Sequence, residues 1–209
     1  MNWFRKKDTQ DERKVNHPND LQIGDMIDFK PRSIIPPDLH GVTLIVKSIN
    51  TYQYAERTVT EFMLATDTEN ISMCCAEYDD GEWVTIGKEV SRAQVLDLFN
   101  ADDFALLFDP DEYANLQVNK VDETLDGWVA DSYHQSKQSS NGYFYDHDRR
   151  SQGTSNFEGD SEEFMLIESE GSPDDYSISV EIWENGETDV YLEVSFPASH
   201  IENYWPSEQ

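Results

Sequence analysis

Cysteine is scarce in this sequence. The only two cysteines, Cys74 and Cys75, are adjacent. Neighbouring residues on a strand point to opposite faces, so a disulfide between them would require a strained turn. We therefore expect two reduced thiols, one in the core and one half-exposed, as is typical of a reducing compartment.

Long apolar runs are also missing. No stretch approaches the roughly 18 apolar residues of a membrane-spanning helix. The segment MNWFRKKDTQDERK is charged from its fifth residue, so it does not resemble a secretory signal, and the sequence predicts a cytoplasmic protein. This aromatic and basic segment could touch an anionic membrane surface weakly through Trp3, Phe4, Arg5, Lys6 and Lys7, although a frayed terminus is the favoured alternative.

Basic residues are few. The chain has 15 Lys and Arg against 43 Asp and Glu, a net charge of −28. Such a surface repels phosphate backbones, which excludes nucleic-acid binding through a basic patch, and it favours basic proteins, polyamines and cations. Mimicry of DNA is one alternative role for the acids, and plain solubility is another. Ten Phe, ten Tyr and five Trp indicate a folded core rather than a disordered chain.

Familiar catalytic motifs are absent. The sequence has no glycine-rich phosphate loop and no HExxH, CxxC or GxSxG pattern, so it predicts no enzyme, no catalytic residue and no cofactor. Asp146, His147 and Asp148 are weak candidates for a metal site, because carboxylate and imidazole both bind divalent ions. On a strand, however, His147 would point away from both aspartates, which favours a solvated loop neutralised by Arg149 and Arg150.

What the sequence does contain is a repeated segment. The letters EFML occur at residues 61–64 and again at 163–166. Each copy is followed by an acidic stretch, a strand-like run, a turn with glycine, and a second run that ends in Glu-Val-Ser at 89–91 or 193–195. This ordered series predicts an internal duplication of an antiparallel β unit.

Alternation in the second copy predicts a hairpin register. A three-residue loop at 184–186 pairs Val180 with Val190 and Ile178 with Leu192, which places all the aliphatic residues on one face. Gly186 then takes the left-handed conformation of a bulged turn.

The first copy allows a loop of the same length. With residues 79–81 as the loop, Ala76 pairs with Val84 and Cys74 pairs with Ile86.

Strands are also predicted over 23–29 and 42–54, with a proline-marked loop between them. Residues 91–100 predict a helix that is capped by Ser91 and has Val95, Leu98 and Phe99 on one face. A second short helix is predicted at 101–108, where Asp102 suits the first turn. The acids at 102–112 do not have the spacing of an EF-hand loop. Long loops are expected around 134–142 and 148–161.

Together these patterns predict a mainly β fold with minor α content. We expect a flexible basic arm (1–18), a first β unit (19–90), a helical connector (91–115) and a second β unit (116–209), packed as one compact body because a single unit would have a thin core. The two copies also carry matched tyrosine pairs, which could line a groove for a ligand or peptide, although packing along the strands is the commoner role. These groove candidates are Tyr52, Tyr54, Tyr143 and Tyr145.

The stretches LQIGDMIDF, TLIVKSINTYQY, EFML and DDGEW, after a MNWFRKK start, resemble the uncharacterised bacterial YjfK-type family over most of the chain. The resemblance brings no catalytic residues and implies an accessory role in envelope or membrane-stress functions. The function predicted first is a non-enzymatic binding or adaptor protein for a basic partner. A ligand-binding protein or enzyme with a site between the two β units is the second hypothesis, and a DNA mimic is the third.

Overall fold

The computed structural model describes residues 13–66, 68–152 and 161–207. Their strands form one 12-stranded antiparallel sheet, so the fold is mainly β as predicted. The strands are β1 (Met26–Phe29), β2 (Leu44–Gln53), β3 (Thr58–Ala65), β4 (Asn70–Tyr78), β5 (Gly81–Glu89), β6 (Asn115–Gln117), β7 (Ser132–Gln135), β8 (Ser140–Tyr145), β9 (Glu162–Ser172), β10 (Tyr176–Trp183), β11 (Thr188–Pro197) and β12 (Ile201–Trp205). The helices are α1 (Arg92–Leu98) and α2 (Ala101–Ala105), with short 3₁₀ turns at Pro18–Asp20, Pro37–Leu39, Leu106–Phe108, Glu123–Leu125 and Ala198–His200.

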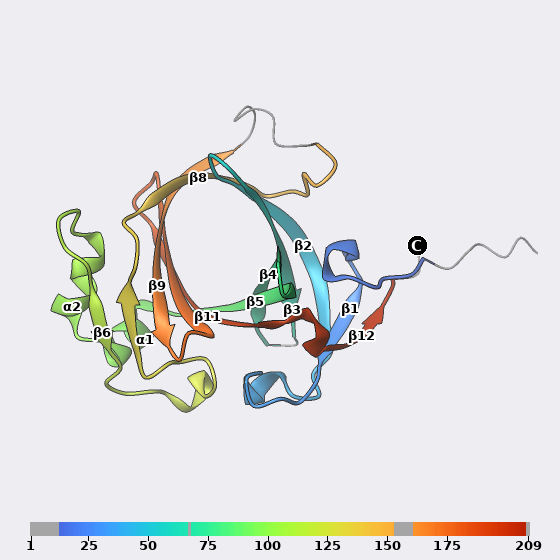
Figure 1. The fold of residues 1–209 in the computed structure, drawn as a ribbon, viewed down its shortest axis with the longest axis horizontal. Coiled ribbons are helices and arrows are strands. Elements are labelled where there is room, and N and C mark those ends of the chain that lie inside the picture. The colour runs from blue at the N-terminus through green and yellow to red at the C-terminus, as the bar shows by residue number, and fades with distance from the viewer. Residues whose placement is uncertain (1–12, 67, 153–160, 208–209) are drawn as a thin grey trace, which may run out of the picture.

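Eight of these strands close into a barrel. The sheet runs in the order β2, β3, β4, β5, β11, β10 and β9, and β8 pairs with both β9 and β2 to complete the ring. Figure 1 looks into this ring, with β8 at its top. β1 and β12 extend the sheet beside β2, while β7 and β6 extend it beside β9. No helix in the described ranges is long and apolar enough to cross a membrane.

The prediction of two similar β units is replaced by this single closed barrel. Its wall takes β2 to β5 from residues 19–90 and β8 to β11 from residues 116–209. The two EFML segments lie in β3 and β9, but on opposite sides of the wall: Phe62 and Leu64 pack in the main core, whereas Phe164 and Leu166 pack in a separate cluster. The structure therefore does not show a duplication.

The predicted register of the second hairpin is confirmed. In β10 and β11, Val180 pairs with Val190 and Ile178 pairs with Leu192. Gly186 closes the three-residue loop with a φ of 85°, in the left-handed region that glycine tolerates best.

The predicted register of the first hairpin is wrong by one residue. Tyr78 pairs with Gly81, so the loop between β4 and β5 has only two residues, 79–80. Cys75 then pairs with Val84, and Met73 pairs with Ile86. The shorter loop suits one-sided burial better, because Met73 joins the fully buried aliphatic residues on the face of Val84 and Ile86.

The two faces of the barrel wall have opposite character. Tyr52 of β2 donates a hydrogen bond to Glu181 of β10, although these strands are not neighbours in the ring. Side chains of distant strands can meet in this way only across the lumen, so the alternating polar residues line the inside. The aliphatic residues, such as Val180 and Leu192, therefore lie on the outer face of the wall.

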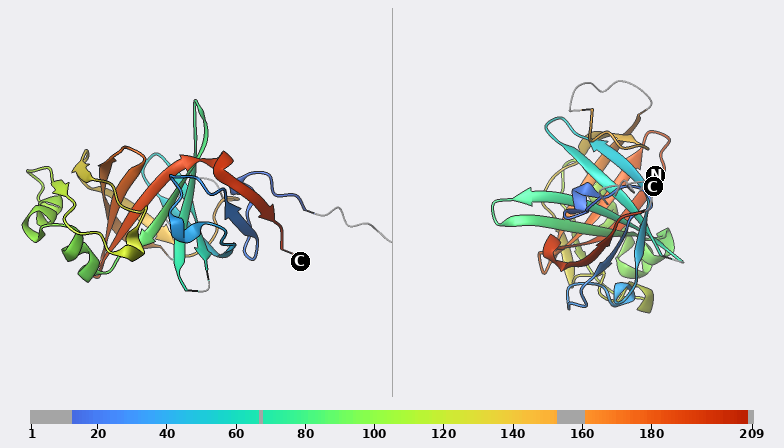
Figure 2. Two further views of the ribbon diagram at one scale, coloured as in Figure 1. Left: turned by 90° about the horizontal axis from the view of Figure 1, so that it is seen from below. Right: turned by 90° about the vertical axis from the view of Figure 1, so that its right-hand side faces the viewer.

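An outer layer covers this apolar face. It consists of residues 13–43, the segment 91–135 and β12, whose buried side chains join those of the wall in one core cluster. Leu21 and Trp128, for example, are fully buried. In Figure 1, α1 and α2 lie outside the barrel on one side and β1 and β12 on the other. Figure 2 shows the hairpin of β4 and β5 projecting beyond this assembly.

The helix predictions are confirmed, and one loop prediction is corrected. Ser91 caps α1, accepting a hydrogen bond from the Gln94 amide, and Val95 and Leu98 are buried. Asp102 lies in the first turn of α2. The long loop expected around 134–142 is reduced to 136–139, because β7 and β8 pair with β9 on either side of it.

Candidate functional site

The barrel encloses a cavity of about 300 Å³. Seven of the eight wall strands contribute side chains to its lining, which is what a site inside the lumen requires. The lining consists of Tyr52, Tyr54, Arg57, Val59, Glu61, Ser72, Cys74, Cys75, Ala76, Tyr78, Thr85, Leu166, Glu168, Ser177, Ser179, Glu181, Tyr191, Glu193 and Ser195. Eight-stranded barrels are the size that holds one small ligand.

Aromatic rings fill one part of the lumen. The ring of Phe164 lies 5.3 Å from that of Tyr52, 5.8 Å from that of Tyr54 and 5.5 Å from that of Trp183, measured between centroids. Phe144 of β8 contacts Tyr52 at 5.1 Å and Trp183 at 5.5 Å. These edge-to-face and tilted contacts are favourable for aromatic pairs, so they hold in place Tyr52 and Tyr54, the two rings of the cluster that line the cavity.

Four glutamates line the remaining part, and three of them, Glu61, Glu181 and Glu193, accept hydrogen bonds from neighbouring side chains. Glu61 accepts a hydrogen bond of 2.8 Å from the Asn50 amide, and Glu181 accepts one of 3.3 Å from the Tyr52 hydroxyl. Glu193 accepts hydrogen bonds of 2.8 Å from the hydroxyls of Ser177 and Ser179. Each carboxyl is held by neutral donors, which fix its position without supplying a positive charge.

Burial changes the protonation of these acids. It raises the pKa of Glu61 to about 7, against a lowering effect of the Asn50 hydrogen bond. It raises the pKa of Glu181 to about 8, and the negative charge of Glu61 adds to the rise. Burial also raises the pKa of Glu193, although its two serine partners oppose the shift. Near neutral pH the lumen thus holds carboxyl groups that can gain or lose a proton.

No described cation pairs with these carboxyls. Within residues 13–66, 68–152 and 161–207, none of the Lys, Arg or His side chains forms an ion pair with Glu61, Glu181 or Glu193. Arg57 also lines the cavity, and its guanidinium carbon lies 5.0 Å from the centre of the Tyr54 ring. Both Arg57 and Tyr78 are exposed, so the cavity opens to solvent beside them.

The two cysteines are free, and each is partly buried. They point to opposite sides of the wall, as predicted for strand neighbours, because Cys75 packs against the outer core and Cys74 lies near the lumen acids. Burial raises the pKa of both thiols, that of Cys75 to about 12. A protonated thiol is a poor nucleophile, so neither cysteine is suited to catalysis.

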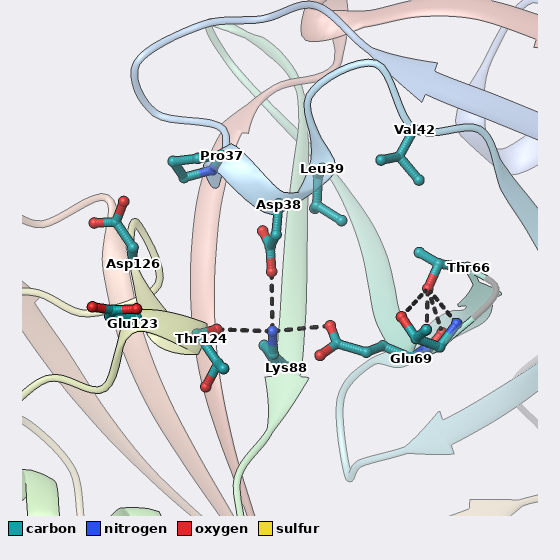
Figure 3. A pocket seen from close by; sticks show the side chains of 11 residues that line it. Pro37, Asp38, Leu39, Val42, Thr66, Glu69, Lys88, Glu123, Thr124 and Asp126 are labelled. Atoms are coloured by element: carbon teal, nitrogen blue, oxygen red, sulfur yellow. Dashed lines mark hydrogen bonds and ion pairs between the residues drawn. The ribbon is translucent and has the colours of Figure 1, made fainter.

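A second cavity, of about 460 Å³, lies outside the barrel wall (Figure 3). At its centre, Lys88 Nζ contacts Asp38 Oδ2 at 3.0 Å, Glu69 Oε2 at 2.9 Å and the Thr124 carbonyl oxygen at 3.0 Å. Burial lowers the pKa of Lys88, but hydrogen bonds to Glu69 and Asp38 outweigh it and raise the pKa overall. Lys88 stays a cation with all three donors used, so it ties the outer layer to β5 and is not a nucleophile.

Replacing Lys88 by methionine is expected to lower the free energy of unfolding by on the order of 2 kcal/mol, because a nearly buried cation and three charge-assisted contacts are lost. The cost stays moderate because Asp38 and Glu69 are 36 % and 41 % exposed and can be hydrated. Urea unfolding measures the change. Lys120→Met is the matched control, since Lys120 is 73 % exposed in its pair with Asp97, and a loss as large as that of Lys88→Met would contradict the argument.

The predicted tyrosine groove is brought together only in part. Tyr52 and Tyr54 line the lumen. Tyr143 and Tyr145 lie on the next strand, β8, but Phe144 between them is the residue that joins the lumen cluster. Tyr145 is buried on the other side of β8, where its hydroxyl donates to Gln53 Oε1 at 3.1 Å.

The Asp146, His147 and Asp148 triplet lies in the segment after β8. Asp148 is hydrogen-bonded by the Arg150 guanidinium, which lowers the pKa of this carboxyl. His147 Nδ1 lies 3.2 Å from Asp146 Oδ1, and both side chains are exposed. In the described ranges no group of three or more His, Cys, Asp or Glu side chains is placed to hold a metal ion.

The lumen acids were not identified from the sequence. Glu181 and Glu193 follow the alternation that predicts a solvated strand face, and Glu61 is part of EFML. The available signal was that residues 177–182 and 190–195 alternate aliphatic residues with serine, tyrosine and glutamate. The basic aromatic cluster from Trp3 to Lys7 lies outside the described residues.

No family model, no curated protein and no solved structure matches this chain.

Proposed function

We propose that this protein is a non-enzymatic binding protein that holds a small organic molecule in the lumen of its barrel. The cavity of about 300 Å³, lined by seven wall strands, is the observation that carries the proposal. Ligand sites in proteins combine apolar and aromatic walls with a few polar groups that orient the ligand. The rings of Tyr52, Tyr54 and Tyr191 and the carboxyls of Glu61 and Glu181 supply both parts.

The size of the cavity limits the ligand. A water molecule takes about 30 Å³ of liquid, so the lumen has room for roughly ten groups of that size. This excludes a folded protein or a long peptide as the occupant of the lumen. The adaptor role for a basic protein partner, predicted from the net charge of −28, stays a separate prediction for the outer surface.

A thermal-shift screen tests the proposal. Panels of small organic cations, anions, zwitterions and neutral polyols are added to the protein, and at least one compound should raise the melting temperature. Ala76→Trp should abolish that rise, because Ala76 is an exposed residue of the cavity lining and the indole would obstruct the lumen.

Leu96→Trp is the matched control, since Leu96 is 50 % exposed on α1, outside the barrel. A change in tryptophan emission on binding that is lost in Trp183→Phe gives a second readout, because the ring of Trp183 packs against the lumen cluster. A screen without any stabilising compound, or a stabilisation that Ala76→Trp leaves unchanged, would refute lumen binding.

A further inference from the structure

We infer that the ligand of this lumen is a small organic cation, an aliphatic amine that carries one or more ammonium groups; this inference rests on the proposed binding function. Glu61, Glu181 and Glu193 face the cavity, and no described cation forms an ion pair with them. The exposed fractions of Glu61 and Glu181 are only 6 % and 7 %.

A buried carboxylate without a counter-charge is costly. Protonation of the acids is one way to avoid this cost, and an ammonium group that supplies the missing charge is the other. An ammonium has hydrogen-bond donors and no acceptor, which suits a set of carboxylate oxygens.

The aromatic side of the cavity fits the same chemistry. Cations bind over the faces of tyrosine and tryptophan rings, where the ring quadrupole is negative. The Arg57 guanidinium already occupies such a position over Tyr54 at the cavity opening. This contact shows that a ring of the cavity lining accepts a cation. The carboxyls of Glu61, Glu181 and Glu193 have no described cation as an ion-pair partner.

The charge of the whole molecule favours the same class of ligand. A net charge of −28 attracts cations toward the cavity opening and repels anions. A neutral polyol is the competing class, because protonated carboxyls and the serine hydroxyls could hydrogen-bond to it. The two classes differ in how their affinity depends on pH.

Several titratable groups surround Glu181. They come from the neighbouring strands of the lumen and are Glu61, Cys74, Tyr52, Tyr54, Tyr191, Glu193, Asp189 and Glu168, with Arg57 at the opening. Apart from Arg57 these groups are neutral or negative. A bound cation stabilises the carboxylate forms, so its binding releases protons and tightens as pH rises through the pKa values of about 7 and about 8. A polyol held by protonated acids would bind less tightly over the same range.

Isothermal titration with putrescine tests the inference, with butanediol as its uncharged analogue. Putrescine should bind at least about tenfold more tightly near pH 9 than near pH 6, since one group of pKa about 7 changes its ionised fraction by that factor. Proton release is measured in buffers of different ionisation enthalpy. Glu181→Gln should weaken putrescine binding by about tenfold or more and reduce the protons released.

The controls separate the possible failures. Glu202→Gln removes an exposed acid of β12 and should leave binding unchanged. Equal binding of putrescine to the wild type, Glu181→Gln and Ala76→Trp would mean attraction to the acidic surface only, which overturns the inference. If butanediol or an anion binds in the lumen and putrescine does not, the inference of a cationic ligand is overturned, while the proposed binding function stands. Absence of any lumen ligand would overturn both.

Discussion

The Glu61→Gln variant should be more stable than the wild type at alkaline pH, by as much as roughly 3 kcal/mol. The pKa of Glu61 is raised from 4.5 to about 7 in the folded protein. A carboxyl with a raised pKa contributes stability that is fully present below its unfolded pKa and is lost as pH rises through its folded pKa. The wild type should therefore lose this contribution between about pH 4.5 and about pH 7, whereas glutamine keeps a neutral side chain throughout.

Urea unfolding at a series of pH values measures the difference between the two proteins. The variant should match the wild type most closely near pH 4.5 and gain on it until about pH 7. Glu181→Gln should also be more stable than the wild type at alkaline pH, and its advantage should keep growing until about pH 8. The exposed Glu202→Gln is the control and should give a flat difference. A pH-independent difference for Glu61→Gln would mean that this carboxyl is ionised in the fold.

Replacing Leu192 by alanine should lower the free energy of unfolding by about 2–5 kcal/mol, the range for a fully buried leucine. Leu192 is 0 % exposed and belongs to the core cluster between the barrel wall and its outer layer. Its truncation leaves a cavity where the wall meets the covering segments. Chemical denaturation monitored by circular dichroism measures the loss.

The adjacent residue supplies the comparison. Tyr191 lies on the lumen side of the same strand, and Tyr191→Phe removes only a hydroxyl from the cavity lining, so the expected cost is below about 1 kcal/mol. A cost of Leu192→Ala no larger than that of Tyr191→Phe would contradict the placement of the apolar core on the outer face of the wall.

Much of the strand structure could be predicted from local patterns. The alternation of Ile178, Val180, Leu192 and Val194 fixed the register of β10 and β11, because only one loop length places all of them on one face. The same argument failed for β4 and β5, where both Ala76 and Cys75 are small enough to face Val84. The two-residue loop was decided by burial of Met73, which pairs with Ile86.

The repeat of EFML was a poor guide to three-dimensional equivalence. Phe62 packs on the outer side of β3, whereas Phe164 points into the lumen from β9. The outer core and the lumen cluster are both apolar, so the same phenylalanine and leucine pattern fits either environment. A strand alternates sides at every residue, and four matching letters do not determine which set of side chains faces inward.

The sequence by itself determined that this chain folds into antiparallel hairpins with one aliphatic face, that a helix capped by Ser91 is followed by a second short helix from residue 101, and that its charge favours cations over anions. Those properties depend on neighbouring residues and on composition. Only the tertiary structure decided that the polar face is a lumen rather than a solvated surface. β8 closes the ring by pairing with both β2 and β9, and this closure brings Glu181 of β10 to Tyr52 and Glu61, which are distant from it in the chain.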